Sequence, residues 1–124
     1  MMPSETSAET QRVLRHHMLA FDEGKVEAIL ADYAPDAVIL TPEGPRRGHD
    51  EIIPFIRWAL ANMFTSTSTF TMIHQAIEGE VAYIVWSAES PYYSIGLGTD
   101  TFLVRGGKIV LQTFAAKLDT KGPD

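Results

Sequence analysis

The sequence predicts one domain of the α+β class, with helices in the first half of the chain and long strands in the second. In the first third of the chain, apolar residues recur at the i, i+3, i+4 spacing of an amphipathic helix. From residue 67 onward, apolar runs alternate with short turns that contain glycine. Such segregation is typical of helices packed on one face of an antiparallel sheet, and 124 residues suffice for one domain.

The first predicted helix covers residues 7–22. Thr6-Ser-Ala-Glu9 resembles a capping box, in which two side chains satisfy free amides at a helix start, and Gly24 follows the expected end. One stripe of this helix consists of Val13, Leu14, His17, Met18 and Phe21. His17 therefore points inward, whereas His16 points away and is expected at the surface.

A second helix is expected over residues 25–33, because Val26, Ile29, Leu30 and Tyr33 repeat at helical spacing before Pro35 ends it. Residues 37–41 read as a strand, and a turn-rich loop and a short edge strand at Arg46-Arg47 follow. A third helix is expected from His49 or Asp50 to Met63, with Pro54 close enough to its start to be tolerated. It is apolar nearly all round, which predicts that it is largely buried. His49 itself is expected at the surface or as a cap.

Two hairpins complete the prediction. Strands 67–77 and 81–90 form the first hairpin, an irregular connection covers 91–97, and strands 98–105 and 108–118 form the second hairpin around Gly106-Gly107. A tight turn there predicts the facing pairs Arg105/Lys108, Val104/Ile109, Phe102/Leu111 and Asp100/Thr113.

Asp100 is the most informative residue of the chain, because it is a carboxylate on a predicted apolar strand face. Alternation places it beside Phe102, Val104, Ile109 and Leu111. A carboxyl group among such neighbours needs a hydrogen-bond partner or remains protonated. Two interpretations stay open at this point: a structural Asp bonded to a nearby Thr or backbone amide, or a residue of a pocket.

Composition excludes several classes of function. The formal net charge of −6 and a pI near 5.1 argue against non-specific nucleic-acid binding. There is no cysteine, no signal-peptide pattern and no apolar run of about 20 residues, so a cytoplasmic protein without membrane contact is expected. Motifs such as HxH, HExxH, GxGxxG and GxSxG are missing, so neither a metal nor a cofactor is expected.

The layout resembles the SnoaL-like or NTF2-like superfamily, also called ketosteroid-isomerase-like. Four stretches carry the likeness, in the expected order: Phe21-Asp-Glu-Gly-Lys-Val-Glu-Ala-Ile-Leu30, Tyr33-Ala-Pro-Asp-Ala-Val38, Gly48-His-Asp-Glu-Ile52 and Asp100-Thr-Phe-Leu-Val-Arg-Gly-Gly-Lys-Ile109. The resemblance implies a cystatin-like cone with three N-terminal helices packed on a curved, mostly antiparallel mixed sheet, usually dimeric. It covers almost the whole chain, residues 1–124, and implies a single domain; the ends at 1–6 and 120–124 are expected to be flexible.

The resemblance also assigns candidate roles. Ketosteroid isomerases use an Asp base before a Pro after the first strand, a Tyr on the first helix and a protonated Asp on a late strand. Asp100 falls on the late Asp, His17 on the Tyr position and Thr41, before Pro42, on the base position. Threonine cannot abstract a carbon-bound proton unaided, so ketosteroid isomerisation of the usual kind is not expected. Relatives of the polyketide-cyclase type, which rely on an acidic residue on a late strand, are more similar.

The expected catalytic residues are Asp100 and His17, in an acid/base proton transfer. His17 could instead be a core histidine bonded to the backbone. Residues expected to line a pocket for a small apolar oxygenated molecule are Tyr33, Thr41, Phe55, Trp58, His74, Tyr83, Trp86, Phe102 and Thr113. For His74 and Tyr83 the alternative is an interface on the convex face of the sheet, and for the aromatic residues it is plain core packing.

Both faces of the last strand carry apolar residues, and helices can cover only one face of a sheet. A homodimer through the outer sheet face is therefore expected, against the alternative of a strand covered by tails and loops. Two functions remain open. One is an isomerase, cyclase or dehydratase of the SnoaL-like kind, and the other is a non-catalytic ligand-binding or dimerisation module of the same fold.

Overall fold

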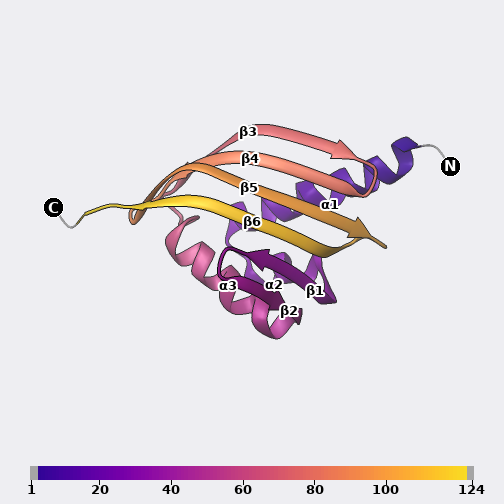
Figure 1. Ribbon diagram of the computed structural model, residues 1–124, viewed down its shortest axis with the longest axis horizontal. Coiled ribbons are helices and arrows are strands. Elements are labelled where there is room, and N and C mark those ends of the chain that lie inside the picture. Colours follow the sequence, from indigo (N-terminus) through magenta and orange to yellow (C-terminus); the bar gives the residue numbers. More distant parts are fainter. Residues whose placement is uncertain (1–2, 123–124) are drawn as a thin grey trace.

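The computed structural model describes residues 3–122 and confirms the α+β class. Within this range the elements follow one another in the order helix, helix, strand, strand, helix and then four strands (Figure 1). Their bounds are α1 Pro3–Glu23, α2 Val26–Ala31, β1 Tyr33–Thr41, β2 Gly44–Arg47, α3 Gly48–Asn62, β3 Thr69–Glu78, β4 Val81–Glu89, β5 Tyr93–Arg105 and β6 Lys108–Thr120. The short edge strand expected at Arg46-Arg47 is present as β2.

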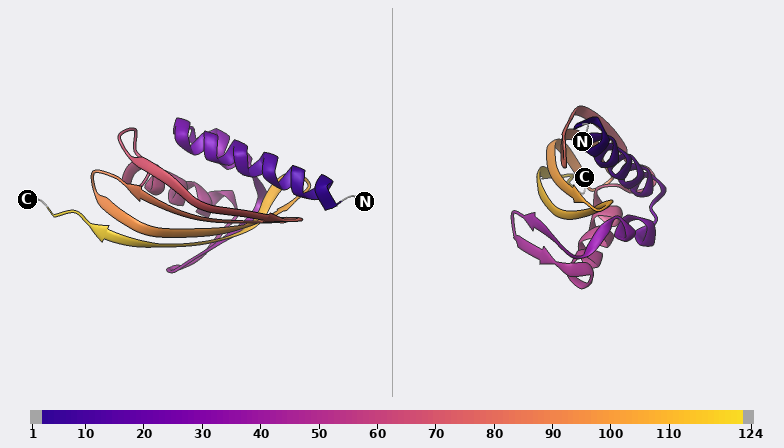
Figure 2. Two further views of the ribbon diagram at one scale, coloured as in Figure 1. Left: turned by 90° about the horizontal axis from the view of Figure 1, so that it is seen from above. Right: turned by 90° about the vertical axis from the view of Figure 1, so that its right-hand side faces the viewer.

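All six strands belong to one mixed sheet in the order β2-β1-β6-β5-β4-β3. The β1–β6 pair is parallel and the other pairs are antiparallel, so the expectation of a mostly antiparallel mixed sheet is confirmed. The sheet is curved, and α1 and α3 lie on its concave side (Figure 2). Side chains on that side of β3–β6 are therefore enclosed between the sheet and the helices.

Several element boundaries differ from the prediction. Helix α1 begins at Pro3, so Thr6 and Glu9 lie within the helix and do not cap its start. Helix α2 ends at Ala31, because Tyr33 pairs with Ile109 as the first residue of β1. Pro35 thus lies inside a strand. The connection expected to be irregular at 91–97 is ordered from Tyr93 onward, since that residue already pairs with β6.

The register of the last hairpin differs from the prediction after its first two pairs. Arg105 pairs with Lys108 and Val104 with Ile109, as predicted, but Leu103 then pairs with Leu111. Val110 is therefore the extra residue of a β-bulge, and a bulge shifts which residues of a strand face each side. Phe102 consequently pairs with Gln112 and Asp100 with Phe114, so Gln112, and not Leu111, shares the inner face with Asp100.

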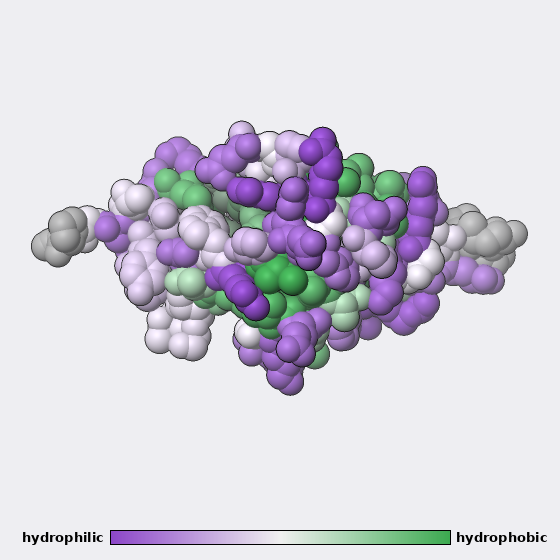
Figure 3. Space-filling model, turned by 90° about the horizontal axis from the view of Figure 1, so that it is seen from below, coloured by the Kyte–Doolittle hydropathy of each residue, from purple (hydrophilic) through white to green (hydrophobic). Residues whose placement is uncertain are grey.

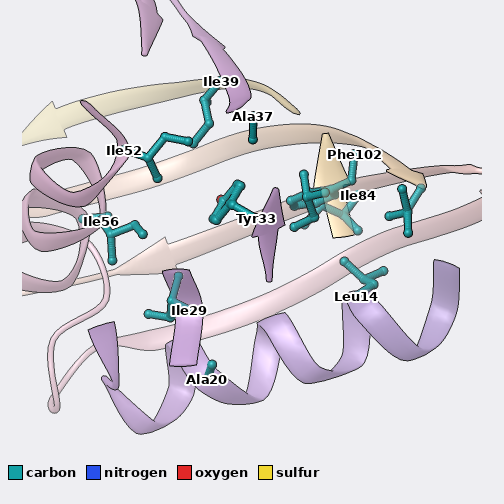
Figure 4. Close-up of a cluster of buried hydrophobic side chains, with 14 of the residues drawn as sticks. Leu14, Ala20, Ile29, Tyr33, Ala37, Ile39, Ile52, Ile56, Ile84 and Phe102 are labelled. Carbon is teal, nitrogen blue, oxygen red and sulfur yellow. The ribbon is translucent and has the colours of Figure 1, made fainter. Parts of the chain in front are cut away.

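The hydrophobic core lies between the helices and the concave face of the sheet (Figure 4). Leu14 and Ala20 reach it from α1, Ile52 and Ile56 from α3, and Ile84 from β4, each nearly inaccessible to solvent. Helix α3 buries only Ile52, Ile56 and Ala59, so the prediction of a largely buried helix is wrong. One face of α3 remains in solvent.

Several large apolar side chains stay exposed. On the outer side of the sheet, Ile73, Val81, Tyr83 and Leu97 are between 39% and 56% accessible. On the side of α3 and β2, hydrophobic surface is bordered by hydrophilic side chains (Figure 3). In the range that the structure describes, no helix has the length and apolar character needed to cross a membrane.

The ends predicted to be flexible, 1–6 and 120–124, fall partly outside the described residues. Within the described range, residues 3–6 form the start of α1 and Thr120 ends β6.

Candidate functional site

A cavity of about 150 Å³ lies between α1, α3 and the concave face of the sheet. Its wall is mainly aromatic and aliphatic, and its polar groups are few. The lining residues are His17, Met18, Phe21, Asp22, Phe55, Ala59, Met63, Phe64, Thr65, Ser68, Phe70, Ile84, Trp86, Asp100, Phe102, Gln112 and Phe114. A mostly apolar pocket with a few convergent polar groups is the usual form of a small-molecule site.

Asp100 is the buried carboxyl group of this cavity, whereas Asp22, which also lines it, is exposed. The residue is only 7% accessible, and both of its oxygens accept hydrogen bonds. Trp86 Nε1 donates to Oδ1 at 2.7 Å, and Gln112 Nε2 donates to Oδ2 at 2.8 Å. Burial raises the pKa of Asp100 from 3.8 to about 6, although the two hydrogen bonds act to lower it. Asp100 thus changes charge close to neutral pH, which suits a general acid or base.

Gly98 explains how the Trp86 indole reaches Asp100. Trp86 pairs with Gly98 on the neighbouring strand, and its ring lies directly over the glycine. A Cβ atom at position 98 would come within 2.3 Å of the indole. The other side of the ring stacks on Phe70 with a centroid distance of 5.6 Å. The missing side chain therefore lets the indole lie across β5 and place its N–H on the carboxylate two residues further along.

Behind Asp100 a chain of buried hydrogen bonds continues to the first helix. Tyr33 donates to Gln112 Oε1 at 2.5 Å, and the same hydroxyl lies 3.2 Å from His17 Nε2. His17 Nδ1 lies 2.9 Å from Asp32 Oδ2. Desolvation raises the pKa of the Tyr33 phenol well above 10.0, and the negative charges of Asp100 and Asp32 raise it further. Tyr33 therefore keeps its proton at neutral pH.

The chain ends near solvent at a second histidine. His16 Nδ1 lies 2.7 Å from Asp32 Oδ1, and the His16 side chain is 57% accessible. Asp32 is itself mostly buried. The sequence predicted a surface position for His16, and the structure adds a carboxylate partner that sequence spacing did not reveal.

Five of the predicted site residues line the cavity: Asp100, His17, Phe55, Trp86 and Phe102. Tyr33 is buried behind the cavity wall and contacts His17 and Gln112. His17 is not a direct partner of Asp100, because both of its ring nitrogens are already engaged by Asp32 and Tyr33. The prediction of a direct contact between Asp100 and His17 is therefore wrong. The two residues are connected through Gln112 and Tyr33.

Three of the predicted pocket residues lie on the outer side of the sheet. His74 pairs with Val85 and is exposed, and Tyr83 lies 6.4 Å from it, ring to ring. The inner face of β4 is instead formed by its even-numbered residues, as their burial shows. The bulge at Val110 turns Thr113 outward as well. The pocket assignment of these three residues is wrong because alternation and the bulge place them on the other face.

Thr41 and Trp58 are also outside the cavity. The hydroxyl of Thr41 donates to the Gly44 carbonyl at 2.8 Å and closes the β1–β2 turn. Trp58 lies on the outer side of α3, is 39% accessible and packs against Tyr93. Neither residue can contact a ligand beside Asp100. The residue that the resemblance assigned to the base position is therefore a turn-forming residue in this structure.

Sequence reasoning missed several residues that build the site. Gln112 and Phe114 were placed on the face opposite Asp100, because a strand without a bulge would put them there. Asp32 was not singled out, since a carboxylate between a helix and a strand carries no periodic signal. Met18 and Phe21 were recognised as inward residues of α1 but not as parts of a cavity wall.

His49 was expected at the surface or as a cap. It lies in the first turn of α3, and its Nε2 atom is 3.0 Å from the Tyr33 carbonyl oxygen. Its ring thus joins α3 to the start of β1. Among the described residues, no group of three or more His, Cys, Asp or Glu side chains is arranged to hold a metal ion.

The fold and this cavity define a small α+β pocket domain. A family model described as SnoaL-like domain matches residues 14–112, and the chain therefore belongs to the SnoaL-like family. A search of the curated proteins found no match to this sequence.

Similar solved structures have the same fold at low sequence identity. One is a protein described as a putative ketosteroid isomerase from Kribbella flavida DSM 17836, at 14% identity and a TM-score of 0.75, covering 95% of this chain and 84% of that chain. Another is an NTF2-like protein of unknown function from Mesorhizobium loti, at 20% identity and a TM-score of 0.73, covering 90% and 93%. A third is a SnoaL-like protein of unknown function from Burkholderia thailandensis E264, at 18% identity and 0.70, covering 89% and 95%.

Proposed function

We propose that this protein binds a small, mostly apolar molecule with an oxygen function and moves a proton on it, with Asp100 as the acid/base group. The observation that carries the proposal is a single buried carboxyl group on the wall of an apolar cavity, with a pKa raised to about 6. About nine-tenths of such a group is ionised at pH 7, so Asp100 is mainly a base in the resting protein.

The size of the cavity limits the substrate. An apolar cavity of about 150 Å³ holds a molecule of roughly the size of benzene, and this cavity has that volume. A monocyclic carbonyl compound fits, whereas a fused four-ring steroid requires most of its body to remain outside. The aromatic wall favours a flat ring, and a substrate carbon beside Asp100 would be the position that loses or gains the proton.

One carboxylate is sufficient for such a reaction. In an allylic isomerisation it takes a proton from one carbon and returns it to another, so no net proton is consumed. Trp86 and Gln112 hold the carboxylate by one hydrogen bond to each oxygen. Each carboxylate oxygen has a further lone pair, and this second position on either oxygen is available for the transferred proton.

The test uses 3-cyclohexen-1-one in deuterated buffer. Wild-type protein is expected to accelerate its conversion to 2-cyclohexen-1-one, or the exchange of its α-protons, as followed by proton NMR. Asp100→Asn should lower this rate by about 10² to 10⁴. Thr113→Val, on the outer face of the neighbouring strand, is the matched control and should retain the rate. Binding is read independently from the indole N–H signal of Trp86, which lies in the cavity wall.

A non-catalytic ligand-binding module is the second candidate, and one observation favours it. Every hydrogen-bonding side chain that meets Asp100 is already bonded within the protein. Thr65 and Ser68, the hydroxyl groups of the cavity wall, bond to each other at 2.9 Å. If the probe shifts the Trp86 signal but neither isomerises nor exchanges its protons, the binding function holds and the catalytic one is refuted.

We further propose that two copies associate through the outer face of the sheet. Ile73, Val81, Tyr83 and Leu97 are large apolar side chains exposed on that side. The helices occupy the opposite, concave side (Figure 2), and within the described chain no element covers the outer face. Large apolar side chains exposed on a sheet face that no described element covers favour an interface.

A further inference from the structure

The buried chain from Asp100 to Asp32 has a direction, because its members differ in which hydrogens they carry. An ionised carboxylate only accepts hydrogen bonds, and Trp86 Nε1 only donates. When Asp100 is ionised, Gln112 must therefore present its NH₂ group to Oδ2, as it does at 2.8 Å. The amide oxygen of Gln112 then faces Tyr33 and must receive the Tyr33 hydroxyl proton.

The same reasoning continues to His17. A phenol has one proton, and Tyr33 has used it on Gln112, so its remaining lone pair faces His17 Nε2 at 3.2 Å. That nitrogen must then carry a proton to donate. His17 Nδ1 faces the Asp32 carboxylate at 2.9 Å, which also only accepts when ionised. With Asp100 and Asp32 both ionised, every group of the chain has a partner only if both ring nitrogens of His17 are donors.

Removing the second proton of His17 while Asp100 stays ionised would leave two lone pairs facing each other somewhere along the chain. A buried polar group without a partner destabilises the folded state, and His17, Tyr33 and Gln112 are all at most 4% accessible. We propose that Gln112 and Tyr33 couple the two ends, so that Asp100 takes its base form only while His17 carries protons on both ring nitrogens.

A second arrangement satisfies the chain when Asp100 is protonated. Rotating the Gln112 amide by half a turn lets it accept from Asp100 and donate to Tyr33, which then donates to His17 Nε2. In this arrangement His17 has lost the Nε2 proton and Asp100 has gained one, while Tyr33 and Gln112 keep theirs. Both arrangements hold the same number of protons. The meaning of this coupling for catalysis rests on the proposed function, in which Asp100 acts as the base.

The other titratable groups around the chain are few among the described residues. Helix α1 contributes His16, bonded to Asp32, and Asp22 at the cavity wall. Helix α3 contributes His49, which contacts the backbone of Tyr33. Strands β4 and β6 contribute Trp86 and Gln112, which do not titrate. The charge that could compete with Asp100 for control of His17 is therefore that of Asp32.

The experiment observes His17 directly, without a substrate, in the complete chain labelled with ¹⁵N-histidine at pH 7.5. Nitrogen shifts and ring N–H signals distinguish a doubly from a singly protonated ring, and His17→Gln assigns the signals. Wild-type His17 is expected to be doubly protonated. In Asp100→Asn, Trp86 forces the Asn oxygen toward itself, so the Asn NH₂ faces Gln112 and every donor in the chain reverses. His17 should then lose the Nε2 proton.

Two further variants separate coupling through the chain from the mere charge of Asp100. Tyr33→Phe keeps both hydrogen bonds to Asp100, and Gln112→Leu keeps the one from Trp86. Both variants interrupt the chain, and His17 should lose the Nε2 proton in each. Thr113→Val, outside the chain, should behave as wild type. A His17 that stays doubly protonated in Asp100→Asn would show control by Asp32 alone and overturn the proposal. A His17 that stays doubly protonated in both Tyr33→Phe and Gln112→Leu would also overturn the proposal, because the charge of Asp100 would then act on His17 through space and not through the hydrogen-bonded chain. None of these outcomes depends on whether cyclohexenone is turned over.

Discussion

Asp100→Asn should make the folded protein more stable at neutral pH, although it removes the central polar group of the cavity. The folded protein holds the pKa of Asp100 at about 6, whereas an unfolded chain has the ordinary value of 3.8. Between these values the folded state binds a proton that the unfolded state has released. The free energy of unfolding of wild type therefore falls as pH rises through this window.

The magnitude follows from the size of the shift. A difference of about 2 pKa units at about 1.36 kcal/mol each amounts to about 3 kcal/mol. This stability is fully present below pH 3.8 and is lost as pH rises past about 6. Asn has no charge to bury and can retain both hydrogen bonds, since its oxygen accepts from Trp86 and its NH₂ donates to a rotated Gln112 amide. The variant should thus exceed wild type by up to about 3 kcal/mol at pH 7.5.

Urea unfolding of both proteins at several pH values between 3.5 and 8 measures this. Asp100 is the titrating group that the two chains do not share. His17 is shared, but its protonation is proposed to follow Asp100, so the difference between the two unfolding free energies reports Asp100 together with the coupled His17 proton. The difference should be near zero at pH 3.5 and should grow with a slope of about 1.4 kcal/mol per pH unit between pH 3.8 and about 6. A difference that does not change with pH, or a wild type that is the more stable protein at pH 7.5, would refute a desolvated Asp100.

Two further predictions concern other parts of the molecule. Gly98→Ala should lower the free energy of unfolding by about 1 to 3 kcal/mol and shift the Trp86 indole N–H signal, because the new Cβ atom would lie 2.3 Å from the ring. Gly96→Ala on the same strand is the control, since nothing surrounds that position, and it should change the free energy of unfolding by less than about 0.5 kcal/mol. Equal effects of the two variants in urea unfolding would contradict the role given to Gly98. The proposed dimer is tested by light scattering after size exclusion. Wild type should have the mass of a dimer, and Tyr83→Glu the mass of a monomer, because Tyr83 is exposed on the outer sheet face. Leu19→Glu is the control and should have the mass of a dimer, because Leu19 is exposed on α1. A wild-type mass of one chain would exclude the dimer.

Local patterns in the sequence were sufficient for most of the elements. The apolar stripe of α1 does face the core, and His17 is buried on it at 1% accessibility. The turn at Gly106-Gly107 forms as expected, with both residues at positive φ of 58° and 74°. These features depend on contacts or conformations within a few residues, which is why periodicity and turn chemistry alone predict them. Asp100 was recognised for the same reason, as a charge at an alternating apolar position.

The site itself depends on contacts between distant parts of the chain. One extra residue at Val110 exchanges the two faces of β6, and this exchange brings Gln112 to Asp100. The hydrogen bond from Tyr33 to Gln112 joins residues 79 positions apart, and the spacing of these residues in the sequence does not predict it. A bulge costs little locally and is stabilised by what it brings together. Sequence periodicity therefore located the acid, and only the packing of the sheet against α1 decided which groups hold its charge.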